Sequence, residues 1–225
     1  MSFLDRTELL IGDSGIEKLN KSKIILFGCG GVGGYVAEML VRSGVGSITI
    51  VDFDDVDVTN INRQIIALQS TVGRKKVDAL KERLLDINPK CTVVSICEKY
   101  HEGSTILNNT YDYVIDAIDS VADKVALIVD AHTRNIKIVS AMGAGNRCDI
   151  PEFKVADIYK TYNDGLSKVV RKKLREKGIN HHKVVFTSSL PMEHDSTTIG
   201  SIAYYPAMCG CVLSSYVIND IIKGV

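Results

Sequence analysis

A chain of 225 residues is long enough for one large domain with a buried core, and this length disfavours several domains. Hydrophobic residues make up 45% of the sequence and charged residues 24%, which are ordinary values for a globular protein. Because 27 basic residues balance 27 acidic ones, any surface that binds nucleic acid must be a local patch.

The first 22 residues are expected to form a helical arm. The opening stretch, "MSFLDRTELLIGDSG", carries acidic residues where a secretory signal would need a basic start and an unbroken apolar core. No run in the sequence approaches the roughly 20 apolar residues of a membrane span. We therefore expect a cytoplasmic protein with no membrane partner.

Strands and helices alternate through residues 23–145. Short apolar runs predict buried strands, and apolar positions three and four residues apart predict helices. The predicted strands lie at 23–27, 47–52, 92–97, 113–119 and 136–141, and the predicted helices at 31–43, 74–87 and 121–135. This alternation predicts an α/β fold, a Rossmann-like and mostly parallel sheet with helices on both faces.

Beyond Gly145 the regular alternation ends. The predicted strands there lie at 153–158 and 183–189, a strongly basic helix at 165–177, and an apolar closing helix at 206–223. Strands without regular crossover helices predict antiparallel C-terminal strands added to the same sheet. We expect one domain, 1–225, whose part 146–225 faces the substrate.

Three glycines lie where the first predicted strand ends and the first predicted helix of the core begins. Gly28, Gly30 and Gly33 have the spacing of a dinucleotide-binding turn, and Asp52 ends the second strand, where an acid can bond ribose hydroxyls. The strand before and the helix after favour nucleotide binding over a purely structural turn. Residues 23–145 are therefore predicted to be a nucleotide-binding core.

The loop after Asp52 is unlike that of a redox Rossmann domain. It contains two asparagines, an arginine and a glutamine, and three basic residues follow at the start of a helix. These are Asn60, Asn62, Arg63, Gln64, Arg74, Lys75 and Lys76. Several cations near a nucleotide suit a triphosphate whose phosphorus is attacked. The alternative is a solvated helix end, although lysines there oppose the helix dipole.

Two aspartates end a later strand, in the motif "VIDAIDS". Asp116 and Asp119 lie at the carboxyl edge of the predicted sheet, where ligands bind in open parallel folds. A carboxylate that faces phosphates can hold Mg²⁺, and Asp119 is our candidate. Asp119 or Ser120 could instead cap the helix at 121–135.

The six cysteines are expected to be free and packed in the core. They are Cys29, Cys91, Cys97, Cys148, Cys209 and Cys211. Because the sequence has no C-x-x-C pair, no zinc is predicted.

Four motifs, "GCGGVGG", "IVDFDDVDVTNINRQ", "VGRKK" and "DAIDS", together resemble the adenylating domain of the ThiF/MoeB/HesA superfamily, which is related to ubiquitin-activating enzymes. The resemblance implies a homodimer in which Arg6 reaches the partner's ATP, and catalysis by Arg6, Arg63, Lys76 and Asp119. It implies that Gly31 contacts phosphate and that Asp52 contacts the ribose. Asn60, Arg63 and Lys76 would contact the triphosphate, and Asp119 would hold magnesium. The other residues expected to bind the nucleotide are Gly28, Gly30, Gly33 and Ser120.

Members that activate ubiquitin-like sulfur carriers usually have zinc-binding cysteine pairs, which this chain lacks. The stretches "VTNINRQIIAL" and "AMGAGNRCDI" resemble a sibling group, the tRNA threonylcarbamoyladenosine dehydratases. That resemblance implies ATP-dependent adenylation of a carboxylate on tRNA, followed by ring closure. Activation of a sulfur-carrier protein is the alternative, and a nicotinamide-dependent oxidoreductase is a third hypothesis that Asn60, Arg63 and Lys76 do not support. A monovalent cation at the 143–145 turn and a sulfur-transfer partner protein stay open.

A basic run supports the tRNA interpretation. A solvated helix face is the ordinary explanation for such a run, but phosphate contacts of this kind bind nucleic acid. The candidate tRNA-binding residues are Lys168, Arg171, Lys172, Arg175 and Lys177. His181 and His182 follow and are not expected to bind metal. The polar stretch 189–200 is expected to be flexible, and its role is open.

Overall fold

The computed structural model describes residues 2–193 and 195–223. The strands are β1 (Lys23–Phe27), β2 (Ser47–Val51), β3 (Thr92–Ile96), β4 (Tyr113–Asp116), β5 (Lys137–Ala141), β6 (Phe153–Asp157) and β7 (Lys183–Thr187). The helices are α1 (Asp5–Lys21), α2 (Gly33–Arg42), α3 (Lys76–Ile87), α4 (Val121–Thr133), α5 (Gly165–Glu176) and α6 (Tyr204–Lys223). Each element predicted from residue 23 onward is present, with ends shifted by a few residues.

All seven strands form one sheet in the order β3-β2-β1-β4-β5-β7-β6. Every neighbouring pair is parallel except β6 and β7, which are antiparallel. The predicted fold is therefore confirmed, and β7 itself continues the parallel part of the sheet beside β5. The chain reverses its direction of travel across the sheet between β1 and β4, so the carboxyl ends of these two strands form a topological switch point.

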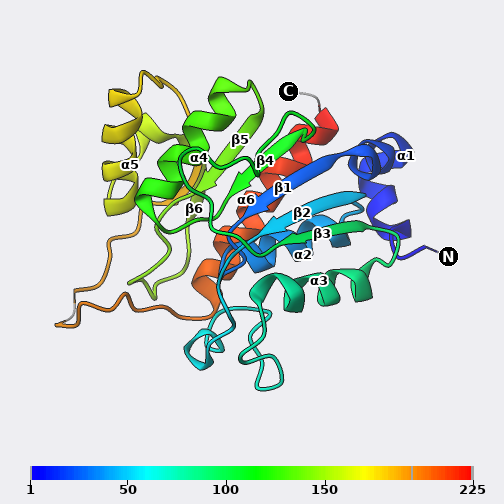
Figure 1. The fold of residues 1–225 in the computed structure, drawn as a ribbon, viewed down its shortest axis with the longest axis horizontal. Coiled ribbons are helices and arrows are strands. Elements are labelled where there is room, and N and C mark those ends of the chain that lie inside the picture. Colours follow the sequence, from blue (N-terminus) through cyan, green and yellow to red (C-terminus); the bar gives the residue numbers. More distant parts are fainter. Residues whose placement is uncertain (1, 194, 224–225) are drawn as a thin grey trace.

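Helices cover both faces of the sheet (Figure 1). Residues of β1 alternate between the two cores: Ile24 and Leu26 pack with α2, α3 and α6, whereas Ile25 and Phe27 pack with α4 and α5. A strand buried on both faces explains why Ile24–Phe27, which follow the exposed Lys23, form a continuous apolar run. Among the helices that the structure describes, none has the length and apolarity needed to cross a membrane.

The predicted N-terminal arm is α1, which lies at the amino end of β1 and β2 (Figure 1). The helix is interrupted at Gly12, whose φ of 70° is outside the helical region. Its first turn places Leu4 against Gly44, and near its end Leu19 accepts a hydrogen bond from Gly46 (3.2 Å). The arm is thus fixed at the edge of the sheet opposite the switch point.

The cysteine prediction is right for some positions and wrong for others. All six cysteines are free, and Cys29, Cys91 and Cys209 are buried. Cys97 and Cys148 are exposed because they lie in the connections after β3 and β5, outside the packed elements. Burial raises the pKa of the Cys29 thiol well above its usual range, which fits a packing role for this residue.

Candidate active site

The glycine turn after β1 is shaped by close backbone approaches. Gly28 has a φ of 91°, and a Cβ there would lie 2.6 Å from the carbonyl oxygen of Ala117. A Cβ on Gly33 would lie 1.8 Å from the carbonyl oxygen of Gly28. Neither position admits a side chain, so both glycines are needed to bring β1, α2 and the end of β4 together.

The N-terminus of α2 faces the switch point with unused donors. Within the described chain, the backbone N–H groups of Gly30, Gly31, Val32 and Gly33 make no hydrogen bond. The N-cap residue, Val32, supplies no side-chain cap. Free N–H groups at the positive end of a helix dipole attract an anion such as phosphate.

Asp52 joins the glycine turn to the loop that follows β2. One carboxylate oxygen accepts from the N–H of Cys29 (2.7 Å), and the other accepts from the N–H of Asp54 (2.9 Å). Asp52 is half-buried, and each oxygen keeps acceptor capacity. The predicted ribose contact therefore comes from a carboxylate that is already oriented by the backbone.

The loop after β2 places Arg63 over the glycine turn. The Arg63 guanidinium donates to the Thr59 carbonyl (2.9 Å) and to the Asn62 side chain (2.8 Å). Its Cγ lies 3.6 Å from where a Cβ on Gly31 would be. Asn60 is buried and accepts from the N–H of Asp57 (3.1 Å) in a capping box that fixes the loop. The structure thus brings Asn60, Arg63 and Gly31 to one place.

Gln64 was named in this loop from the sequence but was given no contact or role there. It is buried, and its Nε2 lies 3.7 Å from where a Cβ on Gly30 would be. Its Oε1 has no hydrogen-bond partner. In the described part of the chain, the only other buried side-chain oxygen or nitrogen without a hydrogen-bond partner is the Ser167 hydroxyl. Such an acceptor calls for an explanation, and a donor on a bound nucleotide supplies one. Its position next to Arg63 was the available signal.

Lys76 is the first residue of α3, where the same loop ends, and is paired with an acid. Its Nζ is 2.6 Å from Asp54, and the exposed fractions of the two side chains are 8% and 45%. Lys75 pairs with Asp55 (2.7 Å) and Arg74 with Glu82 (2.5 Å). These pairs offset the cost of basic residues at a helix N-terminus. The three predicted cations are therefore all held by carboxylates.

The two aspartates at the end of β4 differ sharply. Asp116 is fully buried, pairs with Lys124 (2.8 Å) and accepts from the N–H of Ile118 (3.0 Å). Asp119 is exposed, and its side chain makes no ion pair or hydrogen bond with the described residues. Ser120 occupies the N-cap of α4 without a side-chain cap bond. Of the two aspartates, only Asp119 is free to hold a ligand.

Arg6 lies away from the site of its own subunit. It is exposed on α1, at the end of the sheet where Leu4 touches Gly44. Gly44 follows the C-terminus of α2, whereas the glycine turn lies at the N-terminus of that helix. Ten helical residues span about 15 Å, which exceeds the reach of an arginine side chain. Arg6 therefore does not meet the other predicted catalytic residues within one chain.

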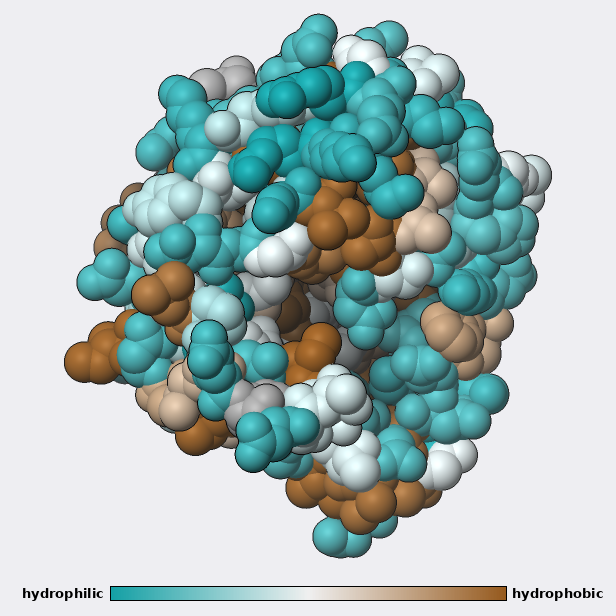
Figure 2. Space-filling view, turned by 90° about the vertical axis from the view of Figure 1, so that its left-hand side faces the viewer, coloured by the Kyte–Doolittle hydropathy of each residue, from teal (hydrophilic) through white to brown (hydrophobic). Residues whose placement is uncertain are grey.

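The basic helix α5 is only partly available to a ligand. Arg171 turns inward and donates to the backbone carbonyl of Thr161 (2.9 Å), and Arg175 lies over the Tyr159 ring (5.2 Å). Lys168 and Lys172 are exposed. Lys177 lines a cavity of about 710 Å³ between α4, α5 and the connection after β3. On the side where α5 lies, hydrophilic residues gather above a hollow in the surface (Figure 2).

His182 is buried and hydrogen-bonded to protein side chains, so its ring nitrogens are not available to a metal ion. It lies 2.8 Å from the Ser140 hydroxyl and 3.3 Å from His132. Among the described residues, no group of three histidine, cysteine or acidic side chains converges as a metal site.

A model of the ThiF family matches residues 4–223. The chain belongs to the ThiF family. This ThiF-family chain is 41% identical to the tRNA threonylcarbamoyladenosine dehydratase of Bacillus subtilis, over 98% of the chain and 94% of that protein. The molybdopterin-synthase adenylyltransferase of Salmonella typhimurium is 31% identical over only 56% of the chain.

Solved structures agree with this family membership. The Escherichia coli tRNA N6-threonylcarbamoyladenosine dehydratase, TcdA, in complex with AMP superposes with a TM-score of 0.92 at 33% identity, over 97% of this chain and 93% of that one. The same enzyme in complex with ATP gives a TM-score of 0.89 over the same shares. This ThiF-family chain therefore shares its whole fold with an enzyme that has been seen with both nucleotides.

Proposed function

We propose that this chain is an ATP-dependent enzyme that adenylates the carboxylate of threonylcarbamoyladenosine in tRNA and lets the activated group cyclise. The observation that carries the proposal is the similarity to the Bacillus subtilis dehydratase over nearly the full length of both chains. The free donors and the unpaired acceptor at the glycine turn support a nucleotide at this site. A cytoplasmic location fits a tRNA substrate.

The proposed reaction has two steps. A carboxylate oxygen attacks the α-phosphorus of ATP, the bond to the bridging oxygen breaks, and pyrophosphate leaves. The neighbouring carbamoyl group then attacks the acyl carbon, and AMP leaves with one carboxylate oxygen, so the substrate loses one water overall. Both nucleophiles belong to the substrate, which removes any need for a catalytic cysteine. Positioning and charge stabilisation are the enzyme's task.

The residues at the switch point divide this task. The N–H groups of the glycine turn, with Gly31, contact phosphate, and Asp52 accepts from the ribose. Arg63, Lys76 and Asn60 hold the triphosphate and stabilise the charge that develops on pyrophosphate. Gln64 accepts a hydrogen bond from the nucleoside. For Lys76 this requires that its ammonium group exchanges Asp54 for a phosphate oxygen.

Magnesium would be held by Asp119. Mg²⁺ commonly uses one or two carboxylates together with water and substrate phosphates, so a cluster of protein ligands is not required. Asp119 fits because it is exposed and unpaired in the described chain, whereas Lys124 already neutralises Asp116. The ion would neutralise phosphate charge when bound.

A second copy of the chain would complete the site. Arg6, Leu9 and Leu10 share one face of α1, being three and four residues apart, and both leucines are 87% exposed. A partner subunit that covers these leucines would also meet Arg6. We therefore propose a homodimer in which Arg6 acts in the other subunit's site. Mixing Arg6→Ala with Asp119→Ala subunits should then restore part of the activity; no restoration after verified subunit exchange would contradict the composite site.

Helix α5 would contact the tRNA backbone. Lys168, Lys172 and Lys177 are exposed and free to reach phosphates. Arg171 and Arg175 would contribute less, because Arg171 is bonded to the backbone and Arg175 is stacked on Tyr159. Nothing in the described part of the chain bears on a sulfur-transfer partner, which stays open.

One assay separates this function from its alternative. Pyrophosphate release is measured with threonylcarbamoyl-modified tRNA, with unmodified tRNA and with a ubiquitin-like carrier protein, and the mass of the tRNA is followed. We expect release with modified tRNA alone, together with loss of one water from it. Release that depends on the carrier, with no change in tRNA mass, would instead support the sulfur-carrier adenylyltransferase.

A further inference from the structure

Arg147 is a buried arginine whose guanidinium is surrounded by backbone carbonyls. Its Nε donates to Ser189 (2.9 Å), its Nη2 to Asn163 (3.0 Å), and its Nη1 to Gly145 (2.9 Å) and, at longer range, to Gly143 (3.5 Å). The side chain belongs to a residue that is only 7% exposed. Within the described residues, no carboxylate lies at ion-pair distance from it. The hydrogen bonds of its guanidinium therefore go to neutral carbonyl oxygens, while its charge acts at longer range on Asp149 and helps to lower the pKa of that carboxyl.

Carbonyl oxygens directed at one buried positive charge are the ligands that proteins use for potassium and similar ions. The oxygens of Gly143 and Gly145 belong to the turn at which the sequence left a monovalent cation open. A planar guanidinium with five N–H donors can satisfy several such carbonyls at once, and it is more weakly hydrated than an ammonium group. We infer that Arg147 is the built-in cation of this turn and takes the place of a monovalent ion.

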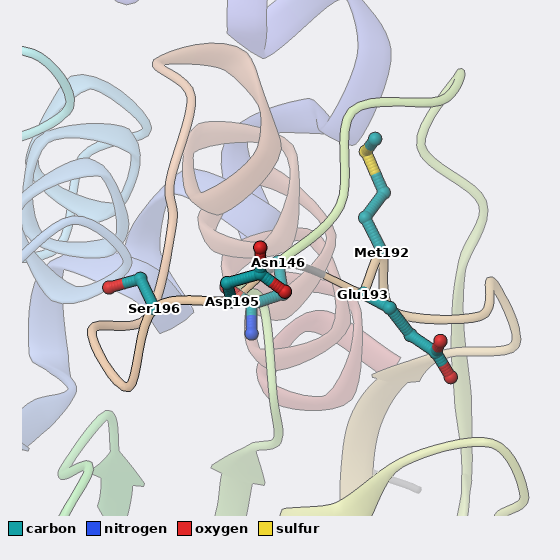
Figure 3. Close-up of a pocket in the computed structure, with 5 residues that line it drawn as sticks. All are labelled: Asn146, Met192, Glu193, Asp195 and Ser196. Atoms are coloured by element: carbon teal, nitrogen blue, oxygen red, sulfur yellow. The ribbon is translucent and has the colours of Figure 1, made fainter.

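The carbonyls that Arg147 holds belong to separate parts of the chain, and one of them begins the segment 189–201. The N–H of Met192 donates to the Asn146 carbonyl (2.6 Å), and the N–H of Gly200 donates to the Asn146 side chain (2.5 Å). Figure 3 shows Asn146 with Met192 and Glu193 on one side and Ser196 on the other. These residues and Asp195 line a cavity of about 470 Å³. The described residues of segment 189–201 are thus folded back onto the turn that Arg147 holds.

The same segment also reaches the nucleotide site. The side chain of Asn62, the residue before Arg63, donates to the Ser201 carbonyl (3.0 Å). Just beyond the segment, Pro206 lies 3.2 Å from where a Cβ on Gly31 would be. The segment is therefore fastened at Arg147 and at the loop that carries Arg63. Arg147 is a positioning residue for this wall of the site.

This inference goes beyond the proposed function, because it holds whichever carboxylate is activated. Its test measures the order of segment 189–201 rather than activity, so its failure and the failure of the proposed function are distinguishable.

The experiment compares the wild-type protein with Arg147→Ala, Arg147→Lys and a control, Arg42→Ala, in which an arginine paired with Glu38 at the end of α2 is removed. A glutamate-specific protease is applied, and the rate of cleavage after the exposed Glu193 is measured together with the melting temperature. Each protein is assayed at constant ionic strength in tetramethylammonium, sodium, potassium, or millimolar guanidinium chloride.

We expect wild-type cleavage and melting temperature to be the same in all four ions. Arg147→Ala should be cleaved about tenfold faster in tetramethylammonium, since several charge-assisted hydrogen bonds are lost. Guanidinium or potassium should slow this cleavage by entering the vacated ring of carbonyls. Arg147→Lys should be intermediate, and Arg42→Ala should match the wild type.

Two results would overturn the inference. The first is potassium-dependent protection of the wild-type protein, which would mean that an ion binds the turn beside Arg147; this measurement needs no variant. The second is cleavage of Arg147→Ala at the wild-type rate in tetramethylammonium, or faster cleavage that no cation slows.

Discussion

Two lysine–aspartate pairs lie near the switch point, and their surroundings differ. Lys124 and Asp116 are 2.8 Å apart with both side chains fully buried, and Lys124 also donates to the Ala141 carbonyl (3.0 Å). Lys76 and Asp54 are 2.6 Å apart, but the Asp54 side chain is 45% exposed. Both residues are thus enclosed in the first pair, whereas in the second pair the lysine is buried and the aspartate is open to water.

The difference decides what each lysine can do. A buried ammonium without its carboxylate is strongly destabilised, so Lys124 cannot leave Asp116 for a ligand. An exposed carboxylate is well solvated by water, so Asp54 can release Lys76 to a phosphate at little cost. The enclosed pair fixes the end of β4 beneath the site, whereas the open pair stores a cation that a nucleotide can recruit.

The largest expected effect is on stability, from the enclosed pair. Lys124→Ala leaves the Asp116 charge buried and unpaired and should lower the free energy of unfolding by about 3–5 kcal/mol. Urea denaturation measures this change. The double variant Lys124→Met with Asp116→Asn should recover much of the loss, because no charge remains buried. A single variant as stable as the wild type would show that Asp116 carries no charge in the folded state.

The open pair should show the reverse behaviour. Lys76→Ala should slow pyrophosphate release about 10²–10³-fold by removing charge stabilisation from the leaving group. Its unfolding free energy should change by less than about 1 kcal/mol, since Asp54 remains hydrated. The control is Lys75→Ala, which breaks the neighbouring pair with Asp55 and should leave activity unchanged. Equal loss in both variants would remove the distinction between them.

A third test concerns His182, another buried polar side chain, which lies within hydrogen-bond distance of Ser140 and His132. Burial lowers the pKa of His182 to about 3, and the nearby His132 and Lys124 add to this effect. Between that pH and about 6.5 the unfolded chain binds the proton and the folded chain does not. The contribution of neutral His182 to the free energy of unfolding is therefore complete above pH 6.5 and is lost as the pH falls.

The expected loss is about 1.5 kcal/mol between pH 6.5 and pH 5. Urea denaturation across this range measures it, and His182→Asn should reduce the slope because the variant has one fewer proton to bind in the unfolded state. His101→Asn, at an exposed position, should leave the slope unchanged. A wild-type stability that does not vary over this range would mean that His182 is protonated in the folded protein.

The fold was predictable because its signals are local. Apolar runs and helical spacing locate the elements, and alternation predicts the parallel sheet. The pairing of β7 with β5 was not predictable, because the pairing of strands that are distant in sequence depends on tertiary packing. Likewise the basic run on α5 was treated as one surface, although the helical period turns Arg171 inward toward Thr161 while Lys168 and Lys172 stay exposed.

The site was predictable in part for the same reason. Asn60 and Arg63 lie close to each other in the sequence and in space, so one loop motif located both. The partners of the charged residues were not apparent: nothing local links Lys124 to Asp116, or Arg147 to the carbonyl of Ser189, 42 residues away. Burial is also invisible in a motif, which is why Gln64 was named beside Arg63 but given no role.

Gln64 offers the smallest and most specific test. Its Oε1 is buried without a partner, so the free protein bears a desolvation cost that a nucleotide donor would remove. Gln64→Leu should weaken ATP binding about five- to tenfold, or about 1 kcal/mol, and should leave the free protein equally stable or slightly more stable. Isothermal titration and urea denaturation measure the two quantities.

The opposite signs distinguish a ligand contact from a structural one. If Gln64 were structural, as Lys124 is, its loss would lower stability and leave affinity unchanged. Gln69→Leu, at an exposed position in the same loop, is the matched control and should change neither quantity. An unchanged ATP affinity in Gln64→Leu would place the unpaired oxygen away from the nucleotide, and the open end of the sheet would then hold its ligand through Arg63, Lys76 and the glycine turn alone.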